Sequence, residues 1–442
     1  MATRAAVNFY VFFFLMNACT KNASECLDFS EDCGDFDLLN FQHFTYHSHN
    51  VERQDCFESA ATMLKMWDLF STFLIPILCL GFYAILVSLL QEKLIYMPRH
   101  YNGQHAQYYK QRRQHTSKQL MNMGSHKIID LQYTIGNDIS QTAYFLAPPS
   151  LRTKKTGNTA SSEPFHLWMA ASGNAGLALD WLDLSVEFMK RKNRKHRKQK
   201  DVAAPGTVVA ANNHGFLLVD YPGYGRNDGD PSPSTILESS QKALLALDNY
   251  LKRRKTKSGG TTEYDVSYVA HSIGCSAVLQ HAVSLLQQGH LAVHRIVLVS
   301  PFTTMVDMAK IALPLPIPGI SYLLRHQWDN VKRMRELGAA LGALHRNDRN
   351  RNVEAASRPR VKIKMAIIHG NSDEIVPVEM GQRVHEVAVE VSQDNQSGGE
   401  DGDEENGGEA TLFDVKYREI KNGDHNRILD KAKQRIFKAM GK

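Results

Sequence analysis

A single serine at the junction of two contrasting runs of residues constrains the fold of this chain more than any other feature. An apolar, strand-like stretch ends in Val269-Ala270-His271, Ser272 follows, and a run of small residues beginning at Gly274 then opens a helix. A chain that passes from strand to helix through one residue turns so sharply that the backbone there is strained and only small neighbours fit two positions away. Ala270 and Gly274 are such neighbours. We therefore predict that Ser272 is a nucleophile exposed at the edge of a sheet.

An acid and a histidine follow this serine, each after a further strand-like run. Asp373 lies in the loop after residues 361–368, and His425 lies on a turn after residues 413–420. Because parallel strands end at one edge of a sheet, the three side chains should converge there in the order serine, acid, histidine. We predict that His425 takes the proton of Ser272 during attack and that Asp373 fixes the tautomer of His425 and stabilises its charged form.

Neighbouring residues of the same types have ordinary explanations. Glu374 and Asp424 are candidates for solvated loop acids, and most of the 19 histidines should be surface or core residues. His271 is the variable residue of the serine motif, and His369 closes the strand before the acid loop. We assign neither of them a catalytic role.

An oxyanion hole would complete the site with two backbone N–H groups. The residue after the nucleophile, Ile273, supplies one of them. The second should come from the loop Ser172-Gly173-Asn174-Ala175-Gly176, which follows a strand-like run at residues 165–171, and Asn174 is the preferred donor. The alternative is that this loop is a plain glycine turn between a strand and a helix.

Six short segments carry a family resemblance: S-G-N-A-G at 172–176, V-D-Y-P-G-Y-G at 219–225, A-H-S-I-G at 270–274, S-P-F-T at 300–303, residues 369–377, and G-D-H-N at 423–426. Over about residues 90–440 the chain resembles the membrane-anchored α/β-hydrolase domain-containing proteins. Within them it is similar to the branch with a single N-terminal anchor, near the acyl-protein thioesterases and lysophospholipid lipases. The resemblance implies the α/β-hydrolase fold. Two positions depart from the family pattern, because relatives usually have His-Gly in place of Ser172-Gly173 and Gly in place of Ala270.

The fold class expected is therefore α/β, with a mostly parallel sheet flanked by helices and a small lid insertion. The 442 residues, 43% of them hydrophobic, suffice for one large domain of this kind with additional segments. An opening antiparallel strand pair is expected at 126–135 and 141–147, followed by parallel strands that alternate with helices.

A membrane anchor is expected ahead of this domain. Residues 69–91 contain no charge between Asp68 and Glu92 and are long enough to cross the hydrocarbon layer. The alternative is a buried core helix. Residues 1–18 suit a signal peptide, because an apolar run at 5–16 follows Arg4 and is too short to span. Residues 19–68 then form a short cysteine-containing segment, and residues 92–442 form the hydrolase domain.

The distribution of charges and cysteines favours a single-pass endomembrane protein with a cytoplasmic catalytic domain. Basic residues are denser after the anchor than before it. Four cysteines precede the anchor, one lies within it, and one falls in the domain: Cys19, Cys26, Cys33 and Cys56, then Cys79, then Cys275. Oxidising conditions thus suit the front segment alone. Glycosylation sequons at Asn22 and Asn395 lie on both sides of the anchor, and the second argues for the opposite orientation.

Three insertions interrupt the domain pattern. A basic run at 190–203 and an acidic run at 393–410 are expected to be disordered loops. Residues 303–360 are expected to form the lid, whose apolar, proline-rich strip at 311–320 either lines an acyl tunnel or packs the core of a small cap. The basic run has no interleaved aromatic residues, so nucleic-acid binding is not expected.

These features predict a membrane-anchored serine hydrolase that cleaves acyl esters or thioesters through an acyl-enzyme. No cofactor or metal is expected, since the cysteines lack C-x-x-C spacing and the histidines lack H-E-x-x-H. The expected substrate is an acyl lipid or an S-acylated protein, because a tethered enzyme meets acyl chains at high local concentration. A serine peptidase-like hydrolase and a non-catalytic membrane scaffold that retains the fold are the alternatives.

Overall fold

The computed structural model of the protein describes Lys65 and residues 70–125, 127–148, 151, 165–202, 213–255, 264–289, 293–313, 317, 319–351, 362–394 and 412–441. The signal peptide predicted at 1–18, the cysteine-containing segment up to residue 64 and most of the acidic loop lie outside these residues. The chain separates into two units, residues 1–78 and residues 79–442. The second unit contains all the predicted site residues and is described below.

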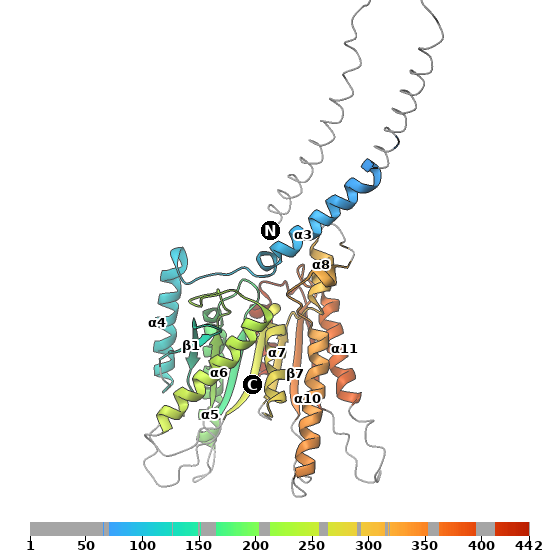
Figure 1. Ribbon diagram of the computed structural model, residues 1–442. Helices are drawn as coiled ribbons and strands as arrows, with labels where there is room; N and C mark the ends of the chain where they lie inside the picture. Colours follow the sequence, from blue (N-terminus) through green and yellow to red (C-terminus); the bar gives the residue numbers. More distant parts are fainter. Residues whose placement is uncertain are drawn as a thin grey trace, which may run out of the picture. The chain divides into compact units, whose positions relative to one another are not determined.

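An eight-stranded sheet forms the centre of this unit (Figure 1). Strands β1 and β2 pair antiparallel, as predicted from the sequence; β2 is also antiparallel to β4, and all later neighbours are parallel. The strand order is β1-β2-β4-β3-β5-β6-β7-β8. The strands are β1 (Ile129–Ile135), β2 (Ile139–Leu146), β3 (Phe165–Ala171), β4 (His214–Val219), β5 (Tyr264–His271), β6 (Val293–Val299), β7 (Ile363–Gly370) and β8 (Phe413–Ile420).

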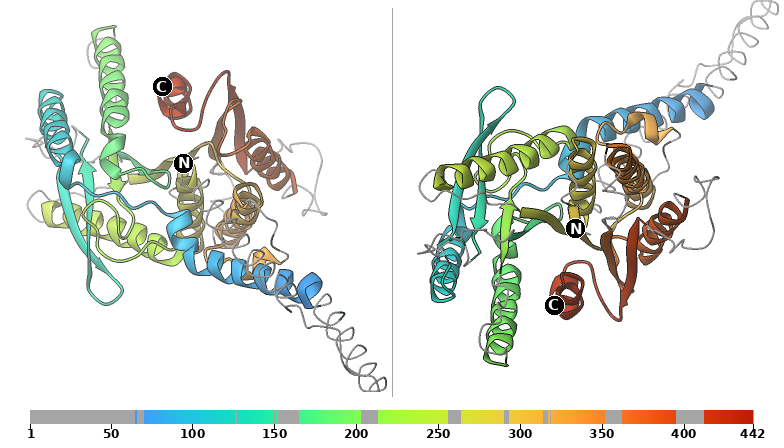
Figure 2. Two further views of the ribbon diagram at one scale, coloured as in Figure 1. Left: turned by 90° about the horizontal axis from the view of Figure 1, so that it is seen from above. Right: turned by 90° about the horizontal axis from the view of Figure 1, so that it is seen from below.

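Helices cover both faces of the sheet and enclose two hydrophobic cores (Figure 2). One core holds apolar side chains of α6 (Pro233–Lys255), α7 (Ile273–Gln287), α10 (Asn330–Arg351) and α11 (Val378–Asp394). The other holds side chains of α4 (Ala106–Asn122), α5 (Leu182–Val202) and α13 (Lys433–Ala439), together with the short elements η5 (Ala178–Trp181), α8 (Met305–Ala312), α9 (Ile320–Leu323) and α12 (Ile428–Lys431). The predicted α/β-hydrolase fold, with a mostly parallel sheet flanked by helices, is confirmed.

Helix α6 illustrates how the sequence builds these layers. The hydroxyl of Ser232, the residue before the helix, accepts a hydrogen bond from Thr235 N at 3.1 Å and so satisfies one of the free N–H groups of the first turn. Leu244, Leu247 and Leu251 recur at helical spacing and are all buried against the sheet. The same strand, loop and helix sequence repeats along the parallel strands, so the loops that follow these strands all lie at one edge of the sheet.

Two predicted insertions turn out to be largely helical. The basic run from Lys190 does not form a loop but continues α5 to Val202. Its lysines and arginines are good helix formers and carry on from the buried first half of the helix, which contains Phe188 and Met189. The segment predicted as a lid, residues 303–360, comprises α8, α9 and α10, of which α10 packs in the core of the domain. We use "cap" for residues 305–328, which contain α8 and α9.

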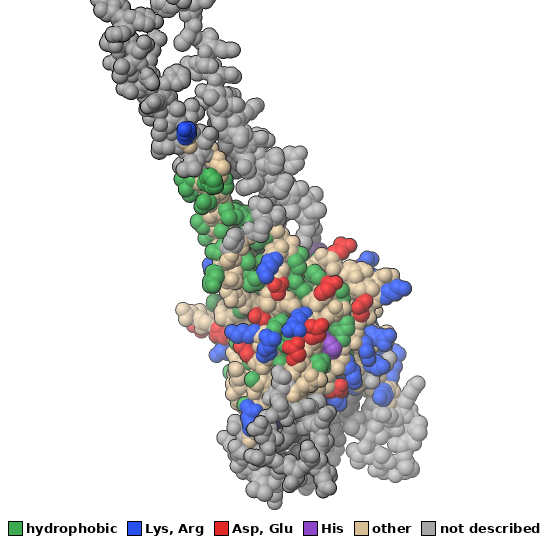
Figure 3. Space-filling model, turned by 90° about the vertical axis from the view of Figure 1, so that its right-hand side faces the viewer, with side chains coloured by type: hydrophobic (Ala, Val, Ile, Leu, Met, Phe, Trp, Pro, Cys, Tyr) green, Lys and Arg blue, Asp and Glu red, His purple; other side chains and the backbone are tan. Residues whose placement is uncertain are grey.

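An apolar helix precedes the domain. A π-helical turn, η2 (Phe70–Leu74), leads into α3 (Ile75–Ile95), and residues Ser71–Ile95 are long and apolar enough to cross a membrane. Only 6% of its most apolar window is buried, which argues against the alternative of a buried core helix. Hydrophobic side chains gather along this helix, whereas charged side chains are spread over the domain (Figure 3). In α3, Phe82 and Leu89 are each 68% exposed.

Candidate active site

Ser272 occupies a strained turn between β5 and α7. Its backbone angles are φ 55° and ψ −124°, a region that residues with a side chain rarely adopt. A Cβ atom on Gly274 would lie 2.5 Å from the carbonyl oxygen of Ala171, so only glycine fits where α7 passes the end of β3. The predicted sharp elbow is therefore present, with Ser272 at its apex. The Ser272 hydroxyl makes no hydrogen bond with any residue that the structure describes.

His425 and Asp373, which are 52 residues apart in sequence, meet at the same edge. His425 Nδ1 lies 2.8 Å from Asp373 Oδ2 and 3.0 Å from Oδ1. A carboxylate only accepts hydrogen bonds, so the proton of the neutral ring sits on Nδ1 and Nε2 keeps a free lone pair. The arrangement leaves Nε2 able to accept a proton.

The loops that carry the acid and the histidine are fastened to each other. Strands β7 and β8 are parallel neighbours, and beyond them Ser372 N donates to Gly423 O at 3.1 Å. Asn422 N donates to the side-chain oxygen of Asn371 at 2.8 Å. A Cβ atom on Gly370 would overlap the carbonyl of Gly423, so the loops touch through glycine backbone. Their contact fixes the separation of the acid and the histidine.

Asp373 is held ionised by its surroundings. Burial alone would raise its pKa, but hydrogen bonds from His369 and His425 and from the backbone N–H of Val376 hold the pKa well below its usual range. Ile375 N also donates to Asp373 Oδ1, at 3.1 Å. By contrast, Glu374 lies exposed beside it. The carboxylate is therefore charged at neutral pH and can stabilise a protonated His425.

His369 positions the acid loop, a role that the sequence did not suggest. Its ring is fully buried, and Nε2 lies 3.0 Å from the carbonyl oxygen of Val376 and 3.5 Å from Asp373 Oδ2. Gly381 leaves room for the ring, because a Cβ there would overlap it. The signal available in the sequence was the position of His369 at the end of the strand that leads to Asp373.

His271 contacts His425 from the opposite side. Its Nε2–H donates to the backbone carbonyl of His425 at 3.0 Å, and the two rings lie 4.7 Å apart. Burial, followed by the neighbouring His425, lowers the pKa of His271 to about 3. His271 is thus neutral at physiological pH and adds no positive charge beside His425. It also ties Ser272, its neighbour in the chain, to the loop that carries His425.

The two predicted oxyanion donors are both unpaired. Neither Ile273 N nor Asn174 N makes a hydrogen bond with a residue that the structure describes. The carbonyl of Gly173 accepts from Gly176 N at 3.0 Å, inside the loop. Because the C=O and N–H of a trans peptide point in opposite directions, Asn174 N–H points out of the loop. Gly173 lies beside the elbow, since a Cβ on it would be 3.4 Å from Ser272 Cβ.

The loop at 172–176 is braced from behind by the chain that follows α3. The carbonyl of Asn174 accepts from Tyr224 OH at 2.5 Å and from Met97 N at 3.2 Å. Arg99 Nη1 donates to the carbonyl of Ala175 at 3.1 Å. Tyr224 is fully buried. These bonds fix the two peptides that follow the candidate donor, and sequence patterns alone gave no indication of them.

Ser172, which stands where relatives usually have histidine, is part of the same support. Its hydroxyl accepts from Trp181 Nε1 at 2.9 Å and donates to Leu177 O at 3.1 Å, and its carbonyl accepts from Tyr221 OH at 2.6 Å. Further behind the loop, Asp220 accepts from Ala178 N at 2.7 Å. Burial raises the pKa of Asp220 to about 7. The departure from the family pattern therefore leaves both the hydroxyl and the carbonyl of Ser172 hydrogen-bonded.

A cavity of about 410 Å³ lies outside this cluster. It is lined by the amino-terminal end of α6, by Gln280 and by the cap residues Arg325 and His326, and none of Ser272, Asp373 or His425 borders it. Among the residues that the structure describes, no group of three or more His, Cys, Asp or Glu side chains is placed to hold a metal ion.

Comparison with known proteins agrees with the fold described above. The family model described as "Alpha/beta hydrolase family" matches residues 201–390, which include β4 to β7, Ser272 and Asp373. The chain has an α/β-hydrolase domain. The chain is also 30% identical over 177 residues to human Protein ABHD12B, an alignment that covers 39% of this chain and 41% of that protein. The chain thus matches about two fifths of the length of this relative.

Two solved structures also align with much of the chain. The esterase Pf2001 of Pyrococcus furiosus aligns over 72% of this chain and 93% of its own, with 12% identity and a TM-score of 0.40. Est1E from Butyrivibrio proteoclasticus aligns over 71% of this chain and 99% of its own, with 13% identity and a TM-score of 0.35. Similarities of this degree say nothing about substrate or mechanism.

Proposed function

We propose that this protein is a membrane-anchored serine hydrolase that cleaves acyl esters or thioesters through an acyl-enzyme. One observation carries the proposal: Ser272 lies at a strained turn, its neighbour His271 is hydrogen-bonded to the backbone carbonyl of His425, and Nδ1 of His425 is held by an ionised aspartate. A structural serine at such a turn would have no need of this histidine and acid.

The chemistry follows from these groups. Ser272 Oγ attacks the acyl carbon while His425 Nε2 takes its proton, and the carbonyl oxygen becomes an oxyanion that the Ile273 and Asn174 N–H groups stabilise. His425 then passes the proton to the departing alcohol or thiol, which leaves the acyl group on Ser272. Water attacks next with His425 again as the base, which releases the acid and restores the serine. No cofactor enters these steps.

The substrate class follows from the anchor. We propose that α3 crosses the bilayer once, so that the domain meets acyl lipids or S-acylated proteins at high local concentration. A serine peptidase-like activity is the second candidate. A non-catalytic scaffold that retains the fold is the third, and the altered oxyanion loop at Ser172-Gly173 is its only support in the sequence. The hydrogen bonds of Ser172 give this departure a structural role.

The deciding experiment uses the full-length protein in detergent or nanodiscs. A fluorophosphonate probe should label Ser272, and a panel of lysophospholipids, neutral lipid esters, S-acylated peptides and plain peptides should identify the class that turns over. Absence of labelling in folded protein would favour the scaffold, and cleavage of plain peptides alone would favour the peptidase.

We also propose that the hydrolase domain faces the cytoplasm. Support comes from the basic residues after the anchor and from the single buried cysteine, Cys275, among the described residues of the domain. In intact microsomes, added protease should digest the domain, and Asn395 should carry no glycan. A protected domain whose mass falls on deglycosylation, with the shift abolished by Asn395→Gln, would reverse the orientation.

A further inference from the structure

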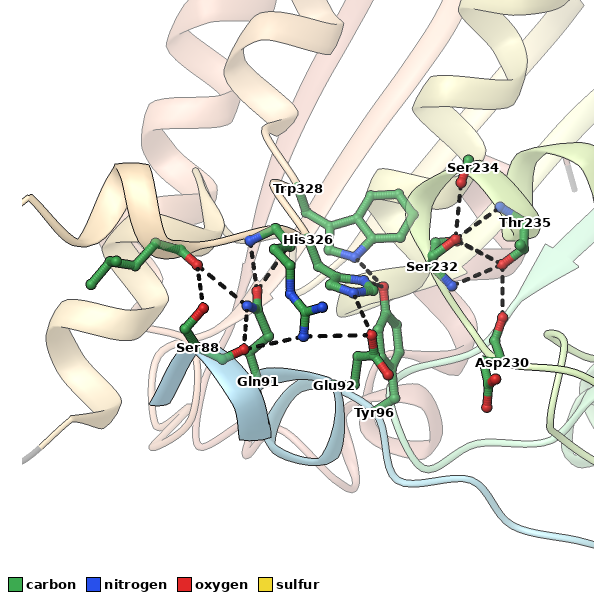
Figure 4. Close-up of polar contacts among 12 residues, drawn as sticks. Ser88, Gln91, Glu92, Tyr96, Asp230, Ser232, Ser234, Thr235, His326 and Trp328 are labelled. Carbon is green, nitrogen blue, oxygen red and sulfur yellow. Dashed lines mark hydrogen bonds and ion pairs between the residues drawn. The ribbon is translucent and has the colours of Figure 1, made fainter. Parts of the chain in front are cut away.

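The carboxyl-terminal end of α3 is hydrogen-bonded to the backbone of the cap. Gln91 is only 1% exposed although it is a polar residue on a largely apolar helix. Its Oε1 accepts from Arg325 N at 2.7 Å and from His326 N at 3.3 Å, while its Nε2 donates to Leu323 O at 3.3 Å (Figure 4). One side chain therefore satisfies backbone groups on both sides of the turn that follows α9.

Adjacent side chains extend this contact. Ser88 Oγ also donates to Leu323 O, at 3.3 Å. One turn further along, Tyr96 OH contacts His326 Nδ1 at 3.2 Å and accepts from Trp328 Nε1 at 3.0 Å (Figure 4). Apolar packing follows the same helix face, where Val87 is buried in the core cluster that contains cap residues. The cap and the end of α3 thus form one packed body.

This contact sets the depth of the cap relative to a bilayer that α3 would cross. About 20 helical residues span the hydrocarbon layer. If the span begins directly after Asp68, it ends at Ser88. If it instead ends directly before Glu92, Ser88 lies a few residues inside that end. At about 1.5 Å per residue, Ser88 lies within about 5 Å of the hydrocarbon boundary in either case. Leu323, which is bonded to Ser88, must lie at the same level.

The exposed side chains of the cap are of types that favour the membrane interface. Tyr322, the neighbour of Leu323, is 92% exposed, and Ile311 near the end of α8 is 54% exposed. Two basic side chains accompany them, Lys310 at 64% and Arg325 at 57% exposure. Tyrosine is enriched at membrane interfaces because its ring is apolar and its hydroxyl polar, and basic side chains favour the headgroup region.

We infer that the cap docks into the interfacial layer of the bilayer through Tyr322 and Ile311, held at that depth by Gln91 and Ser88. The inference rests on the proposed anchor and adds a second contact with lipid. The occupant of this apolar face is the bilayer surface, because the bond between Ser88 and Leu323 places the neighbouring Tyr322 beside the hydrocarbon boundary. Docking would bring the cap side of the domain against the membrane, where acyl substrates reside.

The test measures the lipid contact directly. The full-length protein is placed in nanodiscs of phosphatidylcholine, with or without brominated acyl chains, and the change in tryptophan fluorescence is compared for the wild type, Tyr322→Trp and Lys252→Trp. Lys252 is exposed near the carboxyl end of α6, which points away from the edge that carries the site loops. The added tryptophan should be quenched at position 322 and not at position 252.

A functional arm separates this inference from the proposed activity. The variants Tyr322→Asp and Ile311→Asp should lower the ratio of vesicle-borne to short soluble ester hydrolysis by about tenfold. If the added tryptophan of Tyr322→Trp is unquenched in an active enzyme, the docking alone is overturned. If it is quenched in a protein that hydrolyses nothing, the activity is overturned and the docking stands. A blue-shifted but unquenched tryptophan at this position would mean that a protein surface, such as a second copy, covers this face, and would also overturn the inference.

Discussion

The two halves of the candidate active site are held in different ways. The acid–base half is complete in the free protein: Asp373 is bonded to His425, and their loops are bonded to each other. The nucleophile half leaves the Ser272 hydroxyl and the N–H groups of Ile273 and Asn174 unpaired among the described residues. It takes its rigidity from hydrogen bonds behind it, whose donors include Tyr224 and Arg99. The acid–base half is organised by the charged Asp373 carboxylate and its hydrogen-bond donors. The nucleophile half instead leaves its N–H donors free to bind a substrate.

The largest effect should come from the nucleophile half. Ser272→Ala removes the attacking atom without removing any hydrogen bond to the described residues, so hydrolysis should fall at least about a thousandfold while the melting temperature is unchanged. Turnover is measured with the best ester of the panel, and folding by thermal unfolding. Near-normal turnover in the folded variant would show that Ser272 is not the nucleophile.

Loss of charge should cripple the acid–base half almost as strongly. Asp373→Asn keeps the shape of the side chain but favours the wrong tautomer of His425, so kcat should fall by about 10³ to 10⁴ and probe labelling should become slow. Glu374→Gln is the matched control and should change kcat less than about twofold. The acid would have to be reassigned to Glu374 if the control proved to be the damaging change.

A partial loss of kcat is expected when a hydrogen bond that supports the oxyanion loop is removed. Tyr224→Phe removes the hydroxyl that holds the Asn174 carbonyl, and kcat should fall about tenfold with KM little changed, because the oxyanion forms only after substrate binds. Tyr133→Phe is the control, since it loses a comparable bond to Ser239 far from the site. Equal losses in both variants would mean that general stability, and not the loop, is responsible.

The smallest effect concerns pH and the support behind this loop. Because burial raises the pKa of Asp220 to about 7, the folded protein keeps a proton there that the unfolded chain loses from about pH 4. This contribution to the free energy of unfolding is full below pH 4 and is lost as the pH rises through 7. Asp220→Asn should therefore lose less stability than the wild type between pH 4 and pH 7, as measured by urea unfolding. If the free energies of unfolding of the wild type and the variant changed with pH in parallel, the raised pKa of Asp220 would be contradicted.

The acid–base half was easier to predict from the sequence than its support. Parallel strands end at one edge, so the positions of Asp373 and His425 after strand-like runs sufficed to predict their meeting. The brace at Asn174 could not be predicted, because it joins Met97 and Tyr224, which are 127 residues apart and lie in no motif that requires them to meet. Tertiary contacts of this kind leave no periodic signal.

Two further differences have local causes. Charge runs usually indicate loops, but the basic run from Lys190 continues a helix whose first half is already packed, and extending a helix is easier than starting one. The hydrogen bonds between α3 and the cap were not predicted, because an apolar stretch by itself indicates only a membrane span. Gln91, a polar residue at its end, was the available signal.

The direct passage from α3 into the domain has a kinetic consequence. The helix ends at Ile95, and Met97 is already bonded to Asn174, so no flexible linker separates them. With α3 anchored as proposed, no free tether would separate the helix from the domain, and a substrate held in the bilayer would arrive by lateral diffusion. The rate should follow the mole fraction of substrate among the lipids and fall when inert lipid is added at constant bulk concentration.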